Sequence, residues 1–187
     1  MTYLRWVAGL VLFLQLPVPL YWLVMHPQIH FWRRHQKAAY FAGVLLAWPP
    51  VAMGLVAFRH KLFLVGAPSM WRMVLGFALI VFEGWLFWCA RRDLGTARFV
   101  GTTELSAGGE VISRGIYAHV RNPRYDGSFL AIVGACFLAG TLGLWMVAAG
   151  WTILMLMAIA MEEREMRERF GESYLEYCRR VPRFLPF

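Results

Sequence analysis

Residues 127–160 read GSFLAIVGACFLAGTLGLWMVAAGWTILMLMAIA, a run of 34 positions without a charged side chain. A helix needs about 20 mostly apolar residues to cross the hydrocarbon core of a bilayer, so this run is too long for a single crossing. The Gly140-Thr141-Leu142-Gly143 stretch near its middle is typical of a turn. The sequence therefore predicts a helical hairpin in the membrane, with a short arm over residues 128–139 and a longer arm over residues 142–161.

Three further apolar runs precede this hairpin, over residues 3–25, 38–58 and 73–90, and Pro17 and Pro19 are expected to kink the first. Hydrophobic residues make up 59% of the chain and charged residues 16%, whereas soluble domains are about 45–50% apolar and about 25% charged. We therefore expect an all-α fold, a polytopic membrane helix bundle with about five membrane segments. A chain of 187 residues is expected to form one domain, with three spans in residues 1–90 and a functional core in residues 91–187.

Basic residues are concentrated on one side of the predicted membrane. Residues 26–37, 91–126 and 162–187 carry 15 Lys and Arg residues, against 4 on the other side. Because cytoplasmic loops are enriched in these residues, we expect the N-terminus outside and the C-terminus in the cytoplasm, in a bacterial or archaeal inner membrane. Anionic lipid head groups account for the net charge of +8, so no nucleic-acid partner is expected. Nothing in the sequence indicates an oligomeric state.

The polar tail predicts one further helix, over residues 162–181. Its apolar positions recur every three or four residues and form a stripe, made of Met166, Phe170, Tyr174, Tyr177 and Val181. Such a helix is expected to lie at the cytosolic membrane interface or to cap the bundle. The cysteines are widely spaced and show no metal-ligand pattern, so no metal site is predicted.

A polar cluster at residues 114–125 lies between two predicted spans. The Asn122-Pro123 bond disfavours helical geometry at Asn122, so a new helix is expected to begin just after it. The free N–H groups of a helix start attract anions. Positive charge and aromatic faces come from Arg121, Arg124, Tyr117 and Tyr125. A ligand with a carboxylate, a ribose and an aromatic ring would find partners here; the alternative is an interfacial turn whose arginines face lipid.

A second polar cluster, Glu162-Glu163, follows the last apolar run. At a helix's exit from the membrane, such carboxylates could bind an ammonium or sulfonium group. Neighbouring helix positions point about 100° apart, so we expect one of the two to enter a pocket. A solvated, charged helix start is the alternative.

At these residues the chain resembles the superfamily of isoprenylcysteine carboxyl methyltransferases and phospholipid N-methyltransferases. The family pattern is G-x-Y-x-x-x-R-H-P-x-Y, an apolar hairpin, E-E, and then F-G-x-x-Y-x-x-Y-x-x-x-V-P-x-x-x-P. In this chain it corresponds to Gly115, Tyr117, Arg121, Asn122, Pro123, Tyr125, Glu162, Glu163, Phe170, Gly171, Tyr174, Tyr177, Val181, Pro182 and Pro186. The match covers about residues 110–187, and the first three spans carry no comparable signature.

The resemblance implies an integral membrane methyltransferase that uses S-adenosyl-L-methionine at the cytosolic face and takes lipophilic substrates from the membrane. Carried over to this chain, cofactor contacts would come from Glu110, Val111, Ile112, Tyr117, Asn122, Pro123, Tyr125 and Glu162. Glu163 and Arg121 are the candidate catalytic residues, with Glu163 nearer the acceptor.

Three positions depart from the family pattern. Asn122 replaces the usual His and cannot titrate near neutral pH, which favours cofactor positioning over a catalytic base. Ala158 stands where the prenylcysteine enzymes have an Arg that faces the substrate carboxylate, which weakens the case for that substrate. Gly140-Thr141 replaces an Asn-Pro pair at the hairpin turn.

The acceptor stays open among a phospholipid amine, a thioether acid, a thiol and a small hydrophobic acid. Methyl transfer needs the nucleophile, methyl group and sulfur to be aligned in a dry pocket. A carboxylate or thiolate needs no base, whereas an amine would need one, for which Glu163 or Glu83 are candidates. Two other functions are considered: an NADPH-dependent membrane reductase of the sterol-reductase type, and a non-catalytic membrane scaffold.

Overall fold

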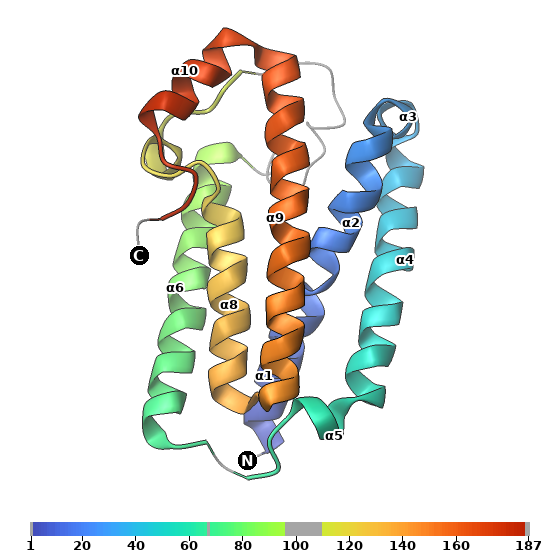
Figure 1. The fold of residues 1–187 in the computed structure, drawn as a ribbon, viewed down its shortest axis with the longest axis vertical. Coiled ribbons are helices and arrows are strands. Elements are labelled where there is room, and N and C mark those ends of the chain that lie inside the picture. The colour runs from blue at the N-terminus through green and yellow to red at the C-terminus, as the bar shows by residue number, and fades with distance from the viewer. Residues whose placement is uncertain (1, 67, 96–109, 186–187) are drawn as a thin grey trace.

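The computed structural model describes residues 2–66, 68–95 and 110–185. Within these ranges the regular elements are helices, and one isolated β-bridge joins Phe63 to Gly140 (Figure 1). The elements are α1 (Thr2–Gln15), α2 (Pro17–Met25), the 3-10 helix η1 (His26–Gln28), α3 (Ile29–Arg34), α4 (Gln36–Ala57), α5 (Arg59–Leu62), α6 (Met70–Leu94), the 3-10 helix η2 (Gly115–Ala118), α8 (Pro123–Ala139), α9 (Leu142–Phe170) and α10 (Glu172–Arg180). The all-α class expected from the sequence is confirmed.

Three helical stretches in the described part of the chain are long and apolar enough to cross a membrane. They are Tyr3–Gln28, Met70–Leu94 and Leu142–Phe170, with mean hydropathies of 1.9, 1.9 and 2.0. Two other expected segments coincide with helices: α4, of which Gly43–Ala57 is apolar, and α8, which has 17 residues. The count of five membrane segments, and the insertion of α8 and α9 as a hairpin, therefore stay predictions.

The first apolar stretch is interrupted where the prolines lie. α1 ends at Gln15 and α2 begins at Pro17. Pro19 has no N–H to donate to the Gln15 carbonyl one turn earlier. The indole Nε1 of Trp151 in α9 donates to that carbonyl instead, at 3.0 Å. The Gln15 carbonyl at the break between α1 and α2 thus receives its hydrogen bond from a side chain that is distant in the sequence.

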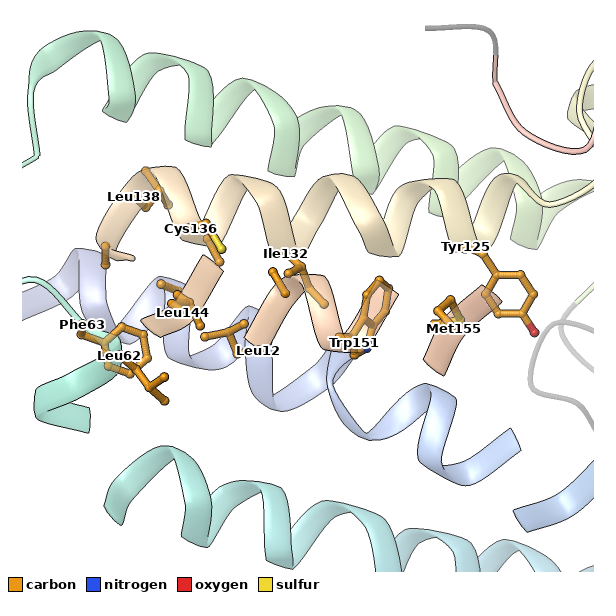
Figure 2. Close-up of a cluster of buried hydrophobic side chains, with 14 of the residues drawn as sticks. Leu12, Leu62, Phe63, Tyr125, Ile132, Cys136, Leu138, Leu144, Trp151 and Met155 are labelled. Carbon is orange, nitrogen blue, oxygen red and sulfur yellow. The ribbon is translucent and has the colours of Figure 1, made fainter. Parts of the chain in front are cut away.

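α8 lies at the centre of the bundle, beside α6 and between it and α9 (Figure 1). Gly76 of α6 and Gly134 of α8 lie at their closest approach: a Cβ added to Gly134 would lie 2.8 Å from the Gly76 carbonyl oxygen, and one on Gly76 would lie 2.9 Å from that of Gly134. Small residues of this kind let helices approach closely in membrane proteins, where van der Waals packing drives helix association. The buried core continues on the other face of α8, where Figure 2 shows Ile132, Cys136, Leu144 and Leu12 among its members.

The turn between α8 and α9 is fixed by hydrogen bonds from other elements. Arg72, in the first turn of α6, donates to the carbonyls of Cys136 (2.9 Å), Phe137 (3.1 Å) and Gly140 (3.1 Å) at the end of α8. The backbone N–H of Thr141 donates to the Leu62 carbonyl at 2.9 Å. A helix end leaves carbonyls without intrahelical donors, and the guanidinium supplies them here.

α9 differs from the sequence prediction at its C-terminal end. A separate helix over residues 162–181 was expected, but α9 runs without interruption from Leu142 to Phe170. No helix-breaking residue separates the apolar run from the Glu-rich turns, so the helix continues through them. Gly171, at φ +55°, ends α9, and α10 begins at Glu172.

Candidate functional site

A cavity lies at the end of the bundle where α10 and η2 cover the ends of α6, α8 and α9 (Figure 1). Its empty space is about 850 Å³, including the part open to solvent. Four parts of the chain line it: the end of α6 at Leu94, the segment at residues 110–112, the stretch from η2 into α8, and the end of α9 with α10. It therefore gathers the two polar clusters that the sequence separates by the apolar run 127–160.

The position of η2 beside the cavity depends on Gly115, which has a φ of +59°. The carboxylate of Asp93, at the end of α6, accepts a hydrogen bond from the Ile116 backbone N–H at 2.7 Å. A Cβ on Gly115 would lie 1.9 Å from this carboxylate. Glycine is therefore required both for the backbone conformation and for the approach of Asp93. This contact holds the Tyr117 segment against α6.

Asn122 joins three segments at the start of α8. Its backbone carbonyl accepts the N–H groups of Tyr125 and Asp126, both at 3.0 Å. Its side-chain amide donates to the Arg183 carbonyl at 3.1 Å and to Glu163 Oε1 at 3.3 Å, and the residue is 8% exposed. These donors engage the chain itself, so the structure gives Asn122 a positioning role in the turn.

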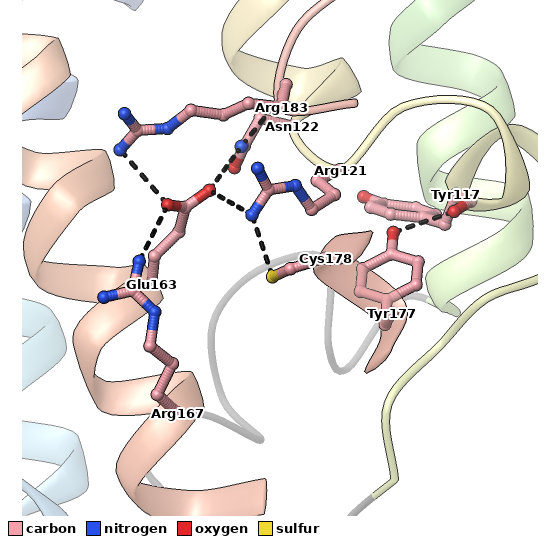
Figure 3. Close-up of polar contacts among 8 residues, drawn as sticks. All are labelled: Tyr117, Arg121, Asn122, Glu163, Arg167, Tyr177, Cys178 and Arg183. Carbon is pink, nitrogen blue, oxygen red and sulfur yellow. Dashed lines mark hydrogen bonds and ion pairs between the residues drawn. The ribbon is translucent and has the colours of Figure 1, made fainter. Parts of the chain in front are cut away.

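Glu163 is the centre of a buried ion network, shown in Figure 3. Its side chain is 5% exposed, and its oxygens lie 3.2 Å from Arg121 Nη1, 3.2 Å from Arg183 Nη2 and 3.6 Å from Arg167 Nη2. Arg121 Nη1 also donates to Cys178 Sγ at 2.9 Å. A buried carboxylate needs such partners to offset its loss of hydration. The network ties α9, α10, the turn before α8 and the C-terminal tail to one another.

Glu162 has a different hydrogen-bond partner from Glu163. The Tyr125 hydroxyl donates to Glu162 Oε2, which links the start of α8 to α9 across the cavity. Both Glu162 and Glu163 border the cavity, so the expectation that one of the two would enter a pocket is wrong.

Two tyrosines of α10, Tyr174 and Tyr177, line the cavity. The Tyr177 hydroxyl donates to the Tyr117 carbonyl at 2.7 Å. Burial raises the pKa of Tyr177 to about 12, and burial, followed by the nearby Glu163 charge, raises the pKa of Tyr174. Both phenols therefore remain protonated at neutral pH and act as hydrogen-bond donors.

The tail after α10 packs along the turn that leads into α8. The Arg121 N–H donates to the Pro182 carbonyl at 2.9 Å, and the Leu185 N–H donates to Asp126 Oδ2 at 3.0 Å. Asp126 is 5% exposed, and burial raises its pKa to about 6, although the hydrogen bond from Leu185 opposes the shift. Asp126 was not predicted as a site residue, although its position directly before the long apolar run 127–160 was a signal in the sequence.

All ten site residues expected from the sequence border this one cavity: Glu110, Val111, Ile112, Tyr117, Arg121, Asn122, Pro123, Tyr125, Glu162 and Glu163. The lining also includes residues that were not expected to contribute, namely Leu94, Met166, Arg169, Phe170, Tyr174 and Tyr177. Glu83 is not part of the lining; it lies on α6, where its Cγ would be 3.3 Å from a Cβ on Gly127.

These features define a class: helical membrane proteins with a polar cavity at one end of the bundle. The family model for phospholipid methyltransferases matches residues 71–173. Since this covers more than half of the chain, the protein belongs to the phospholipid methyltransferase family. The family resemblance expected from the motifs is thereby confirmed.

Two relatives are similar to parts of the chain. Protein-S-isoprenylcysteine O-methyltransferase of Xenopus laevis is 29% identical over 126 residues, which are 63% of this chain and 41% of the relative. Methanethiol S-methyltransferase 1 of Bradyrhizobium diazoefficiens is 36% identical over 72 residues, 38% of this chain and 25% of the relative. The similarity thus spans less than half the length of either relative. No solved structure matches the chain.

Proposed function

We propose that this protein transfers a methyl group from S-adenosyl-L-methionine to a lipophilic or amphiphilic acceptor at the cytosolic face of a membrane. The observation that carries the proposal is the cavity, which brings the Tyr125–Glu162 pair together with the Arg121–Glu163 ion pair, and these four residues lie within the region matched to the family.

The residues around the cavity suit the parts of S-adenosyl-L-methionine. The Glu162 carboxylate is suited to the ammonium group, the arginine-rich side to the carboxylate, and Tyr117 with Ile112 and Val111 to the adenine and ribose. When bound, the cofactor would supply an electrophilic methyl group on a sulfonium. We assign Tyr125 the role of holding the Glu162 carboxylate in place through its hydroxyl.

Glu163 and Arg121, the candidate catalytic residues, form one ion pair at the cavity wall. The carboxylate of Glu163 already forms ion pairs with three guanidinium groups and accepts a hydrogen bond from Asn122. Because these contacts already engage the carboxylate, we assign the Glu163–Arg121 pair the role of fixing the shape and charge of the cavity where the methyl acceptor binds. It is less suited to removing a proton from the acceptor. An acceptor that needs no base, such as a carboxylate or a thiolate, fits this arrangement best.

The route by which the acceptor reaches the cavity is inferred from the exposed side chains of α6 and α9. Apolar side chains at the middle of α6 and α9 are exposed, as expected for surfaces that face lipid tails. The names of the relatives include a prenylated cysteine and a small thiol as acceptors. We propose a carboxylate or thiol acceptor that enters from the membrane, and the C-terminal cavity would face the cytoplasm according to the positive-inside rule.

Ligand-dependent thermal shifts of the detergent-purified protein test this function. S-adenosylhomocysteine should raise the melting temperature, because a ligand that binds the native state stabilises it. Glu162→Gln should lower the affinity for S-adenosylhomocysteine at least tenfold. Glu168→Gln changes an exposed carboxylate of the same helix outside the cavity lining, so it should leave this affinity unchanged. Stabilisation by NADPH alone would point to the reductase, and stabilisation by neither ligand would point to the scaffold.

Methyl transfer is then measured directly. Membranes that contain the protein are supplied with S-adenosyl-L-methionine labelled in the methyl group, and the labelled lipid and small-molecule fractions are separated. Label in an ester or thioether product supports the acceptor proposed here, while label confined to quaternary amines would contradict it.

A further inference from the structure

A second cavity lies between α1 and α4, at the end of the bundle that holds the N-terminus and α5, away from the first cavity (Figure 1). Its space is about 1,230 Å³, including the part open to the surroundings. The walls between the two helices are apolar, and include Leu10, Phe13 and Leu55. The end nearest the N-terminus is basic, with Arg5 and Arg59. We call this cavity the α1–α4 groove.

Side chains of the protein leave the α1–α4 groove open. A Cβ on Gly9 would meet no atom within 4 Å. Trp6, Leu10 and Val56 are 75%, 59% and 63% exposed. α1 belongs to the apolar stretch Tyr3–Gln28, so these apolar surfaces would face lipid in a membrane. A groove of this kind is filled by hydrocarbon when the protein is embedded.

Among the residues that the structure describes, no acidic side chain pairs with Arg5 or Arg59 at the basic end of the α1–α4 groove. No Asp or Glu occurs in the sequence before Glu83. Arg5 donates one hydrogen bond to the Val65 carbonyl, and Arg59 Nη1 donates to the Val56 carbonyl at 3.1 Å. These bonds orient each guanidinium, and each group carries five N–H donors in all. Oriented guanidinium groups beside an apolar channel complement a phosphate that bears hydrocarbon chains.

We infer that the α1–α4 groove binds an anionic phospholipid, with its phosphate on Arg5 and Arg59 and one acyl chain along α1 past Gly9. At a rise of 1.5 Å per residue, the eight steps from Arg5 to Phe13 span about 12 Å, which accommodates the upper part of an acyl chain. This lipid occupies the leaflet opposite the cofactor cavity, so it is a structural ligand and not the methyl acceptor. The inference does not depend on the proposed methyl transfer.

Native mass spectrometry of the whole protein, released from detergent after addition of lipid, tests this inference. Phosphatidylglycerol and phosphatidylcholine with the same acyl chains are compared at equal concentrations. The wild-type protein should retain phosphatidylglycerol at least five times more than phosphatidylcholine. The Arg5→Gln/Arg59→Gln variant should lose this preference. Gly9→Leu, which fills the groove and leaves both arginines in place, should reduce retention of both lipids.

Two control variants should behave as the wild type. Lys61→Gln removes a charge at the same end but outside the groove lining, and Gly150→Leu adds the same side chain on α9, where a Cβ has no neighbour within 4 Å. Equal retention of the two lipids by the wild type would overturn the inference. An unchanged preference in Arg5→Gln/Arg59→Gln, or wild-type retention of both lipids in Gly9→Leu, would also overturn it. A lipid-free dimer that Gly9→Leu dissociates would assign the groove to a second copy of the chain.

Discussion

At the scale of single residues, the contacts of Asn122 show what an amide can do at a motif position. The family has His at this position, whereas the Asn122 amide donates to the Arg183 carbonyl and to Glu163. Neutral histidine has one N–H donor, but the side-chain amide of Asn has two on one nitrogen. One compact group thus holds both α9 and the C-terminal tail, and it does so at any pH near neutrality.

Replacing Asn122 with Asp removes both donors and places a carboxylate next to Glu163. Loss of a buried hydrogen-bond partner costs about 1–3 kcal/mol, and the added charge costs more. We expect Asn122→Asp to lower the melting temperature and to weaken S-adenosylhomocysteine binding at least tenfold in calorimetry. Asn122→His, which keeps one donor, should have a smaller effect on both; equal losses in the two variants would contradict the donor role.

Asp126 predicts a specific dependence of stability on pH. Burial raises its pKa from 3.8 to about 6 in the folded protein. Between these values the folded state binds more protons than the unfolded state, so the contribution of Asp126 to stability falls as the pH rises through this window. Asp126→Asn should match the wild type in melting temperature near pH 4 and exceed it at pH 7.5. A constant difference between the two proteins across that range would argue against the raised pKa.

At the scale of elements, the contact between α6 and α8 depends on the absence of side chains at Gly76 and Gly134. In Gly134→Ala the new Cβ would collide with the Gly76 backbone, which cannot move without separating the helices. Overpacking of this kind typically costs about 1–3 kcal/mol. Gly150→Ala, on an open face of α9, should be neutral or stabilising by up to about 1 kcal/mol. Denaturation of both variants in the same detergent measures the difference, and similar stabilities would show that the helices can adjust.

The junction between α1 and α2 offers a test of backbone satisfaction. Trp151→Phe removes the donor to the Gln15 carbonyl, which Pro19 leaves without its usual partner. We expect this variant to lose about 1–2 kcal/mol of stability. Pro19→Ala supplies a backbone N–H at the matching position, so it should reduce the cost of Trp151→Phe. A double-mutant cycle measures this coupling, and additive effects would mean that the carbonyl finds no new donor.

The elements and the site differed in how far the sequence predicted them. Apolar runs predicted helices over most of α1, α2, α4, α6, α8 and α9, because the requirement for about 20 apolar residues is local. The end of α9 was missed, since polarity changes at Glu162 while helical geometry does not. Motif residues predicted the cavity lining well. Tyr174 and Tyr177 were predicted as part of an apolar stripe and of the family motif but not as cavity-lining residues, because the contact of Tyr177 with Tyr117 depends on how α10 folds back.

At the scale of the whole molecule, the network around Glu163 includes one residue from beyond α10, Arg183, which ties the C-terminal tail to the wall of the cavity. Arg183 contributes a guanidinium to Glu163 and its carbonyl to Asn122, while Leu185 binds Asp126. These contacts cross the start of α8, so the tail holds together the two polar clusters that the apolar run 127–160 separates in sequence.

Removing residues 183–187 therefore should open the cavity without unfolding the bundle. The helices are held by α6–α8 packing and by the core around α8, neither of which involves the tail beyond a contact of Phe184 with the core's edge. We expect the truncated protein to keep its helical circular dichroism and to lose S-adenosylhomocysteine affinity at least tenfold. Arg183→Lys in the full-length chain keeps one charge but loses the planar fork, so its affinity should lie between the two. Wild-type affinity in the truncated protein would show that Glu163 is held well enough by Arg121 and Arg167 alone.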